Sequence, residues 1–566
     1  MNLLFVFFLC FAVRVASVFI VKTFYVPDEY WQSLEVAHKI TFGYGYLTWE
    51  WVYGIRSYVY PMLIAGVYKL LALLRLDTAQ WLVIVPRILQ ATLSAYSDYR
   101  FFIWTGKKKW GLFLTIASWF WFYMGSRTLS NTLESSLTTI ALSFFPWYGE
   151  GIAYLWPAIL CCFLRPTAAI IWLPLVFYHL RKSKISWTNL IFKRYLVISL
   201  TVAAVVIGID SYMHGRFLVT PYEFLKYNIF QNIGNFYGSH PWYWYFTVGL
   251  PTVLGINFLP FLFGTIETIR KHESYPVRKY LLVTIVLALA VLSAVEHKEF
   301  RFVTVLMPLC FYIATDTLTR WSYKASSLVL WIVAILIVVG NAIPAWYLST
   351  VHQRGPIDVM AKLGDIAVEY RSSENRPVNI LFLMPCHSTP YYSHIHQNVS
   401  MRFLTCEPNL KQLPDYKDEA DLFFESPIHW LRSHIPSYPR SAKPSHVVLY
   451  EPLAKTINDF LVDYKQVCTI ENAEVNNNVD PNIILNDWSA LMKENELNVD
   501  SLLQYINSRT GKHILVYQRL RDGEDNKFNR DEFKRDATAA RLVEFDDDHL
   551  SYYQDDEFET DRNLFN

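Results

Sequence analysis

Apolar residues dominate the first 348 positions of the chain in long runs that polar residues separate. A helix needs about 20 mostly apolar residues to cross the hydrocarbon core of a bilayer. The pattern predicts helices at 3–21, 58–74, 80–102, 110–124, 131–147, 151–164, 167–180, 194–210, 242–268, 279–295, 300–319 and 326–347. Prolines interrupt the stretch 110–180, so two of its short segments are expected to merge or to be re-entrant. We therefore expect an α-helical polytopic membrane protein with about 11 transmembrane helices.

The pattern changes after residue 348. Short apolar runs of strand type, NILFLM (379–384), HVVLY (446–450) and HILVY (513–517), stand between polar stretches of helical type such as 484–508. This alternation predicts a soluble α/β domain over residues 349–540. Residues 541–566 are strongly acidic, and a run of like charges usually stays solvated and flexible.

Composition agrees with a membrane protein. Of the 566 residues, 53% are hydrophobic and 18% are charged, and the net charge is +1. Soluble globular domains carry roughly 25% charged residues. These figures exclude a disordered chain, a small disulfide-stapled secreted domain, and a nucleic-acid-binding protein with a basic face.

The loop 22–57 between the first two predicted spans is rich in aromatic residues and carries Asp28 and Glu29 directly after Pro27. Asp28 has two interpretations. It is a helix N-cap, or it is a catalytic carboxylate at the membrane boundary, where nearby Tyr and Trp side chains pack on a sugar and remove water from the acid. Aromatic residues are also enriched at membrane interfaces, so they do not decide between the two.

A second polar segment, SAVEHKEFRF (293–302), places five ionisable residues between two apolar runs. It is either a solvated turn or a site that faces a cavity or a charged ligand. Gly, Asn and Pro, which a plain turn favours, are absent from it. Lys298 and Arg301 are suited to binding a phosphate, as a point charge and as a bidentate fork.

Two further segments mix polar residues with apolar ones. In RTLSNTLESS (127–136), Arg127, Asn131 and Glu134 share a helical face and are expected either to pair inside the bundle or to serve the site. In NFYGSHPWYW (235–244), His240 lies among aromatic residues that form either an interfacial belt or the wall of an acceptor groove.

Cysteine usage in the C-terminal part suggests an oxidising compartment. Cys386 and Cys406 flank a single N-glycosylation sequon at Asn398, which makes a Cys386–Cys406 disulfide in a luminal domain plausible. Histidines near Cys386 also invite a zinc site, but their spacing matches no regular zinc pattern. We expect the disulfide and no metal.

Several of these segments together resemble a known family. They are PDEYWQSLEVAH, FGYGYLTWEW, RTLSNTLE, NFYGSHPWYWY and HKEFRF. They are similar to the multispanning mannosyltransferases of the endoplasmic reticulum that use dolichyl-phosphate-mannose, glycosyltransferase family 22. HQRGPIDVM (352–360) and LFLMPCHSTPYYSHIH (381–396) resemble the branch that extends the glycosylphosphatidylinositol (GPI) precursor.

The resemblance implies a GT-C fold, in which a bundle of membrane helices carries the catalytic acid on its first luminal loop. Asp28 would be the catalytic base, with Glu29 beside it. The donor would be β-linked dolichyl-phosphate-mannose and the acceptor the GPI precursor lipid, whose second mannose receives the new sugar on its 2-OH. A β donor and an α product imply inversion in a single displacement. The resemblance further implies the endoplasmic reticulum membrane, with the active site and the C-terminal domain in the lumen.

Such chemistry requires positive charge near the leaving phosphate and polar or aromatic contacts to the sugars. We expect Lys298 and Arg301 at the donor phosphate, with Arg127 and His297 as second choices. The candidates for acceptor or sugar binding are Trp31, Gln32, Glu35, Trp49 and His240. Because the leaving group is already a phosphate, we expect no cofactor and no obligatory metal, although adjacent Asp and Glu residues are able to hold a divalent ion.

Three alternatives remain open at this point. A related enzyme would act on the lipid precursor of N-glycans. A transporter or lipid scramblase would use Asp28, Glu134 and Lys298 to line a pathway. A non-catalytic subunit of a membrane complex would tolerate Asp28→Asn.

Overall fold

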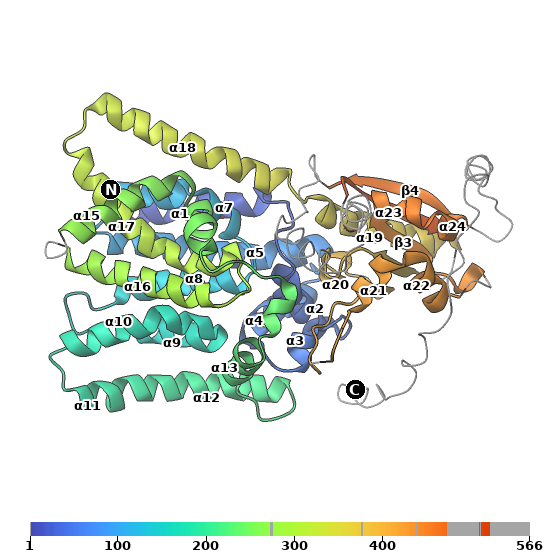
Figure 1. The fold of residues 1–566 in the computed structure, drawn as a ribbon, viewed down its shortest axis with the longest axis horizontal. Helices are drawn as coiled ribbons and strands as arrows, with labels where there is room; N and C mark the ends of the chain where they lie inside the picture. The colour runs from blue at the N-terminus through green and yellow to red at the C-terminus, as the bar shows by residue number, and fades with distance from the viewer. Residues whose placement is uncertain are drawn as a thin grey trace.

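The computed structural model describes residues 2–271, 275–374, 377–411, 413–436, 440–472, 509 and 511–520. Figure 1 shows two parts: a bundle of long helices with roughly parallel axes, and a smaller domain with a sheet at one end of the bundle. The first polar loop and its short helices lie at the junction of the two parts. The acidic tail 541–566 and the expected helix 484–508 lie outside the described residues.

The bundle and its loops contain eighteen described α-helices. They are α1 (Leu3–Ile20), α2 (Glu35–Phe42), α3 (Trp49–Val52), α4 (Val59–Leu73), α5 (Ala79–Trp104), α6 (Lys109–Ala117), α7 (Trp119–Met124), α8 (Ser130–Phe144), α9 (Leu155–Leu164), α10 (Ala169–Lys182), α11 (Trp187–Leu190), α12 (Leu196–Met213), α13 (Thr220–Leu225), α14 (Leu250–Leu254), α15 (Phe258–Arg270), α16 (Pro276–Ala294), α17 (Met307–Ser322) and α18 (Ser327–Thr350).

Short 3₁₀ and π segments join or extend these helices. The π segments are η1 (Tyr30–Leu34), η3 (Ile191–Tyr195), η4 (Lys226–Phe230) and η6 (Tyr245–Gly249). The 3₁₀ segments are η2 (Pro166–Ala168), η5 (Ile233–Tyr237), η7 (Gly255–Asn257), η9 (Phe300–Leu306) and η10 (Arg440–Ala442).

Each apolar run predicted from the sequence coincides with helical structure. Among the described residues, six helical stretches are long and apolar enough to cross a membrane: Leu3–Ile20, Trp187–Met213, Tyr245–Arg270, Pro276–Ala294, Phe300–Ser322 and Ser327–Ser373. Val59–Leu73 and Leu155–Leu164 are apolar but shorter. The chain is thus a polytopic helical membrane protein, and the number of about 11 spans stays a prediction.

Several buried polar residues of the bundle bind one another. Arg14 of α1 is fully buried and donates from Nε to Asp98 of α5 at 2.6 Å, and the indole of Trp121 donates to the same carboxylate at 2.7 Å. Ser94 of α5 and Ser136 of α8 lie 3.2 Å apart, because small side chains let these two helices approach closely. Buried charges and hydroxyls without such partners would be costly in a membrane.

The C-terminal domain is built on a five-stranded mixed sheet with the order β2-β1-β3-β5-β4. The strands are β1 (Asn379–Leu383), β2 (Ser400–Phe403), β3 (His446–Tyr450), β4 (Tyr464–Glu471) and β5 (His513–Arg519). β1 pairs in parallel with β2 and β3, and β5 pairs antiparallel with β3 and β4. The three strands expected from apolar runs are confirmed. β2 and β4 were not predicted, because these edge strands are largely exposed and lack a continuous apolar run.

Helices cover the sheet on both faces. They are α19 (Gly355–Glu374), α20 (Tyr392–Ile395), α21 (Glu419–Glu425), α22 (Pro427–His434), α23 (Glu451–Thr456) and α24 (Asn458–Leu461). One face packs against α19 through Val359 and Leu363, and the other packs against Phe423 and Trp430 of α21 and α22.

The first of these apolar cores does not end at the domain. Trp31 and Leu34 of the first loop and Tyr68 of α4 belong to the same buried cluster as β1 and α19. The loop that carries Asp28 is therefore packed into the C-terminal domain on one side and into the bundle on the other.

Candidate active site

A cavity of about 500 Å³ lies where the first loop, the segment 295–302 and the C-terminal domain meet. Carboxylates and cations line it in equal number: Asp28, Glu50, Glu134 and Glu299 face Arg56, Arg165, Lys298 and Arg301. Apolar side chains of α16 and η9 line another part: Ala288, Leu292, Val305 and Leu306. The cavity thus combines a charged region with an apolar region from two helical stretches that are suited to spanning the membrane.

Asp28 is at the centre of the charged region. Arg301 donates from Nη1 to Asp28 Oδ2, and Gln32 donates to the same oxygen at 2.5 Å. Arg301 also binds Glu299 through two nitrogens, with Nε at 2.6 Å from Oε2. Within the described part of the chain, both hydrogen bonds to this carboxylate fall on Oδ2, and the side chain keeps 20% of its surface exposed. Asp28 lines the cavity.

The helix-cap interpretation of Asp28 is not what the structure has. The backbone amides of Tyr30 and Trp31 both donate to the carbonyl oxygen of Pro27, at 2.9 and 3.0 Å. The carboxylate of Asp28 instead meets Arg301 and Gln32. The start of this helix is satisfied by its own backbone, which leaves the Asp28 side chain to the site.

Glu29, the next residue of the same helix, points away from the cavity. Its side chain is 2% exposed and accepts from Arg127 Nη1 at 2.6 Å, and its carbonyl oxygen accepts from Ser33 and Thr128. Neither Glu29 nor Arg127 lines the cavity. The expected pairing of Arg127 with Glu134 is wrong, because Glu134 binds Arg165 at 2.7 Å while Arg127 reaches across to the first loop.

The segment between α16 and η9 lines the cavity with three ionisable residues, His297, Lys298 and Glu299. His297 contacts Glu299 Oε1 through Nε2 at 3.1 Å and the carbonyl of Gly238 through Nδ1 at 3.0 Å. Burial lowers the pKa of His297, but the hydrogen bond and charge of Glu299 outweigh it and raise the pKa above its usual value. Burial likewise raises the pKa of Glu299, and Arg301 and His297 outweigh it and hold it well below its usual range.

Lys298 differs from the other cations of the cavity. Its ammonium donates to the carbonyl oxygens of Val295 at 2.5 Å and His240 at 2.8 Å. Arg56, Arg165 and Arg301 each bind a carboxylate instead. Lys298 thus brings to the cavity wall a positive charge whose hydrogen bonds, among the described residues, go to carbonyl oxygens and not to a carboxylate.

The expected acceptor-binding residues separate into two groups. Trp31, Trp49 and His240 line the cavity, with the indole of Trp49 donating to Tyr237 at 2.9 Å and His240 stacked on Trp244. Gln32 stands behind Asp28 and bridges it to Glu50 at 3.1 Å. Three of the expected residues therefore line the cavity, whereas Gln32 contacts the Asp28 carboxylate without lining it.

Glu35 does not reach the cavity. It is fully buried and accepts from the backbone amide of Tyr391 at 2.8 Å and from the hydroxyl of Ser393 at 2.5 Å. Burial, partly offset by these hydrogen bonds, raises the pKa of Glu35 to about 7. Glu35 joins the first loop to the C-terminal domain.

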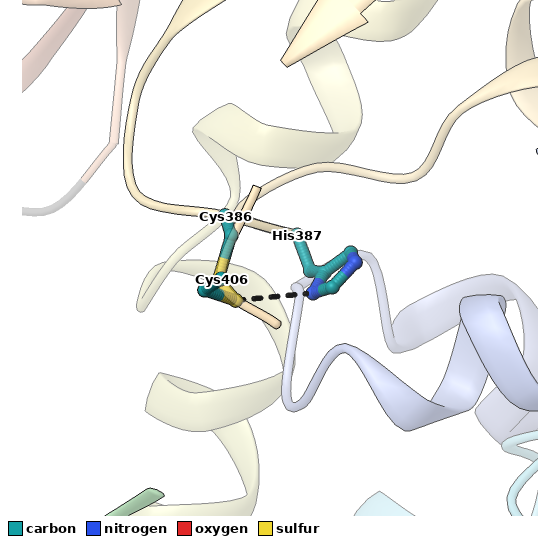
Figure 2. Close-up of side chains that lie close together, drawn as sticks. All are labelled: Cys386, His387 and Cys406. Carbon is teal, nitrogen blue, oxygen red and sulfur yellow. Dashed lines mark hydrogen bonds between the residues drawn. A yellow bond between two sulfur atoms is a disulfide. The ribbon is translucent and has the colours of Figure 1, made fainter. Parts of the chain in front are cut away.

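The structure joins Cys386 and Cys406 in a disulfide with Cα atoms 5.8 Å apart, and Figure 2 shows it beside His387. These three side chains lie close enough to hold a metal, but the two sulfur atoms are bonded to each other and cannot both act as thiolate ligands. Asn398 of the sequon is exposed, so it is accessible to glycosylation.

Several cavity residues were not singled out from the sequence. Glu50 binds Arg56 at 2.7 Å and Arg165 binds Glu134. His387 was considered only among the histidines near Cys386 that invite a zinc site, and it lines the cavity from the C-terminal domain. The spacing of these residues along the sequence did not mark them as site residues, because some bind partners that are distant in sequence and others lie among ordinary aromatic residues.

Residues 5–396 match the model of the Alg9-like mannosyltransferase family. The chain is 67% identical over 94% of its length to GPI mannosyltransferase 3 of Drosophila melanogaster, of which it covers 94%. It is 42% identical over 86% of its length to GPI alpha-1,2-mannosyltransferase 3 of Danio rerio and 38% identical over 80% to that of Homo sapiens, covering 90% and 81% of them.

Among solved structures, ArnT from Cupriavidus metallidurans bound to undecaprenyl phosphate is similar, with a TM-score of 0.53 and 12% identity. The match covers 82% of this chain and 95% of ArnT. At this identity the similarity concerns the fold. It agrees with the fold expected for a membrane glycosyltransferase.

Proposed function

The chain belongs to the Alg9-like mannosyltransferase family, and we propose that it adds an α1,2-linked mannose to the GPI precursor at the membrane of the endoplasmic reticulum, on the luminal side. The donor is dolichyl-phosphate-mannose and the acceptor is the second mannose of the precursor. Relatives named GPI alpha-1,2-mannosyltransferase 3 that cover most of this chain support the acceptor and the linkage. Membership of an enzyme family argues against the transporter and the non-catalytic subunit.

The observation that carries the mechanism is the placement of Asp28. Its side chain lines the cavity, and its carboxylate meets Arg301 and Gln32 through Oδ2. In the proposed reaction Asp28 takes the proton of the acceptor 2-OH while that oxygen attacks C1 of the donor mannose. The bond between C1 and the phosphate oxygen breaks at the same time, and dolichyl phosphate leaves from the opposite face. The β linkage of the donor thereby becomes the α linkage of the product.

Charge on the leaving phosphate needs a partner in the cavity. Lys298 is the best suited, because its ammonium contacts carbonyl oxygens rather than a carboxylate. Arg301 contributes to the same field but is shared between Asp28 and Glu299. We assign Arg301 mainly to orienting Asp28, and His297 to holding Glu299 in place.

The apolar part of the cavity supports a lipid-linked donor. Leu292 of α16 and Leu306 of η9 line it, and both belong to helical stretches long and apolar enough to cross a membrane. A polyprenyl chain that enters between these helices would bring its phosphate to the level of Lys298. The residues present need no bound ion for this, since the phosphate is a monoanionic diester in the donor.

The test compares wild type with Asp28→Asn in membranes of cells that lack the endogenous enzyme, at matched expression. Dolichyl-phosphate-mannose is supplied and the GPI intermediates are separated. Wild type should convert the two-mannose lipid, and Asp28→Asn should lose at least about 100-fold in rate, the usual contribution of a general base. The matched control is Asp365→Asn on the exposed surface of α19, which should keep its rate.

Two other outcomes would refute parts of the proposal. Extension of an N-glycan lipid precursor in place of the GPI lipid would identify that precursor as the acceptor of this enzyme. Full activity of Asp28→Asn would remove Asp28 from the role of base.

A further inference from the structure

The C-terminal domain contributes directly to the cavity. Cys386, His387 and Cys406 line it, and all three come from the segments around β1 and β2 rather than from the bundle. The apolar lipid-facing part of the cavity is formed by α16 and η9 of the bundle. The C-terminal domain therefore forms part of the cavity wall outside the lipid-facing part. The glycan of a membrane-anchored acceptor would extend towards this wall.

His387 is held there in an unusual backbone conformation. Its φ is +55°, in the left-handed region that a residue with a side chain rarely adopts. The disulfide begins at the preceding residue, and the ring packs against Trp31 with centroids 4.5 Å apart and against Phe403 at 5.2 Å. A strained conformation that the surroundings fix in this way is a feature of functional sites.

The two ring nitrogens have different surroundings. Nδ1 lies 3.8 Å from Cys406 Sγ, the contact drawn as a dashed line in Figure 2, while the second nitrogen is turned away from the sulfur atoms. Nε2 is buried and has no hydrogen-bond partner among the residues the structure describes. Buried polar groups in folded proteins nearly always have a partner, so this nitrogen calls for one.

The ring is also close enough to Asp28 for the carboxylate to act on it. Burial lowers the pKa of His387 to about 4, and the charge of Asp28 works in the opposite direction. The imidazole is therefore neutral at neutral pH. With Nδ1 protonated towards the sulfur, Nε2 presents a lone pair that accepts from a hydroxyl group.

From this geometry we propose that His387 is an acceptor-binding residue, whose Nε2 accepts a hydrogen bond from a hydroxyl of the acceptor glycan other than the hydroxyl that reacts. The proposal rests on the proposed function, since it places the acceptor sugar against Asp28. It gives the C-terminal domain a part in acceptor recognition, and it gives the disulfide the task of fixing the recognising side chain.

The test uses the full-length protein and a mannoside glycolipid acceptor, together with monodeoxy analogues that each lack one non-reacting hydroxyl. His387→Asn is the chosen variant, because Asn tolerates the left-handed conformation and should preserve folding. The matched control is His396→Asn. His396 also has a positive φ, +43°, and contacts His38 at the same junction, but it does not line the cavity.

We expect His387→Asn to raise the KM for the acceptor about 10-fold, the usual effect of one lost hydrogen bond, with the KM for the donor unchanged. For wild type and for His396→Asn, one deoxy analogue should have a KM about 10-fold higher than that of the parent acceptor. For His387→Asn, this analogue and the parent acceptor should have the same KM.

A structural role alone would lower the amount of active enzyme and leave every deoxy penalty intact, which would overturn the proposal. If wild type itself failed to extend the mannoside, the proposed function would fail and this inference with it. Activity of wild type together with unchanged penalties in His387→Asn would refute only the role of His387.

Discussion

Asp28 and Glu29 are neighbours in the sequence, but their carboxylates lie in opposite environments. Asp28 faces the cavity with 20% of its side chain exposed, whereas Glu29 is 2% exposed and bound to Arg127. Adjacent residues of a helix point in directions about 100° apart, so one of them is available for chemistry while the other ties the first loop to the bundle. An acidic pair in sequence is thus divided into one group that lines the cavity and one that is buried in an ion pair.

The structural role of Glu29 predicts a loss of stability. Glu29→Gln leaves the Arg127 guanidinium buried without a charged partner, which costs about 3 kcal/mol of unfolding free energy. Thermal unfolding in detergent would measure the change. The double variant Glu29→Gln/Arg127→Met should be less destabilised than the sum of the two single variants. Additive losses would mean that the two side chains are not coupled.

Lys298 should act on the donor. Lys298→Gln replaces the ammonium group with a neutral amide, which still donates to the carbonyl oxygens of Val295 and His240 but carries no charge. We expect the KM for dolichyl-phosphate-mannose to rise about 10-fold or more, with the thermal unfolding midpoint unchanged. Lys362→Gln on the exposed face of α19 is the charge-matched control. An unchanged donor KM in Lys298→Gln would assign the phosphate to another cation.

Glu35 should make the junction between loop and domain sensitive to pH. Its pKa is raised to about 7 in the folded protein, above the ordinary value of 4.5, mainly by burial. A raised pKa means that the folded state holds the proton more tightly than the unfolded state. The contribution of protonated Glu35 to the free energy of unfolding is therefore full below pH 4.5 and is lost as the pH rises towards and through 7. The loss amounts to about 3 kcal/mol.

The measurement is the unfolding midpoint of wild type and Glu35→Gln between pH 4.5 and 8. The difference between them should change with pH across that window in favour of wild type at low pH. Glu369→Gln, at an exposed position of α19, should follow wild type at every pH. Parallel curves for wild type and Glu35→Gln would contradict the raised pKa.

The disulfide should contribute both stability and acceptor affinity. It joins two cysteines with a sequence separation of 20 residues. Closing such a loop lowers the entropy of the unfolded chain and so stabilises the folded state by about 3 kcal/mol. Cys386→Ser/Cys406→Ser should lower the unfolding midpoint and, because His387 is no longer fixed, raise the KM for the acceptor. Alkylation of the wild-type protein with and without reductant, followed by mass spectrometry, checks that the bond forms. A stability loss with an unchanged acceptor KM would separate the disulfide from recognition.

The sequence predicted what depends on local pattern. The apolar runs located the helices, and three short apolar runs located β1, β3 and β5, because each pattern repeats over neighbouring residues. The edge strands β2 and β4 were missed, since their polar, half-exposed residues resemble loop sequence. The ionisable residues of HKEFRF were recognised because charges between apolar runs are costly unless they have a purpose.

Contacts between distant segments were not predictable in the same way. Arg301 and Asp28 are 273 residues apart, and Glu35 and Ser393 are 358 apart. Glu35 was expected at the sugar because it follows Asp28 on the same helix. The structure gives it to the C-terminal domain instead, since the backbone amides of Tyr391 and Ser393 approach only in the folded chain. His387 was considered only as one of the histidines near Cys386 that invite a zinc site, because no pattern of residue types reveals its backbone conformation.

The π segment η1, Tyr30–Leu34, stands between Asp28 and Glu35. A π turn holds one more residue than an α turn, and each residue of a helix corresponds to about 100° of rotation. The length of this stretch therefore sets the angle between the carboxylate of Asp28, which lines the cavity, and that of Glu35, which binds the C-terminal domain. Substitutions within η1 leave that angle alone, whereas loss of a single residue would turn one carboxylate away from its target. Natural variation in this part of the chain should accordingly consist of replacements and not of insertions or deletions.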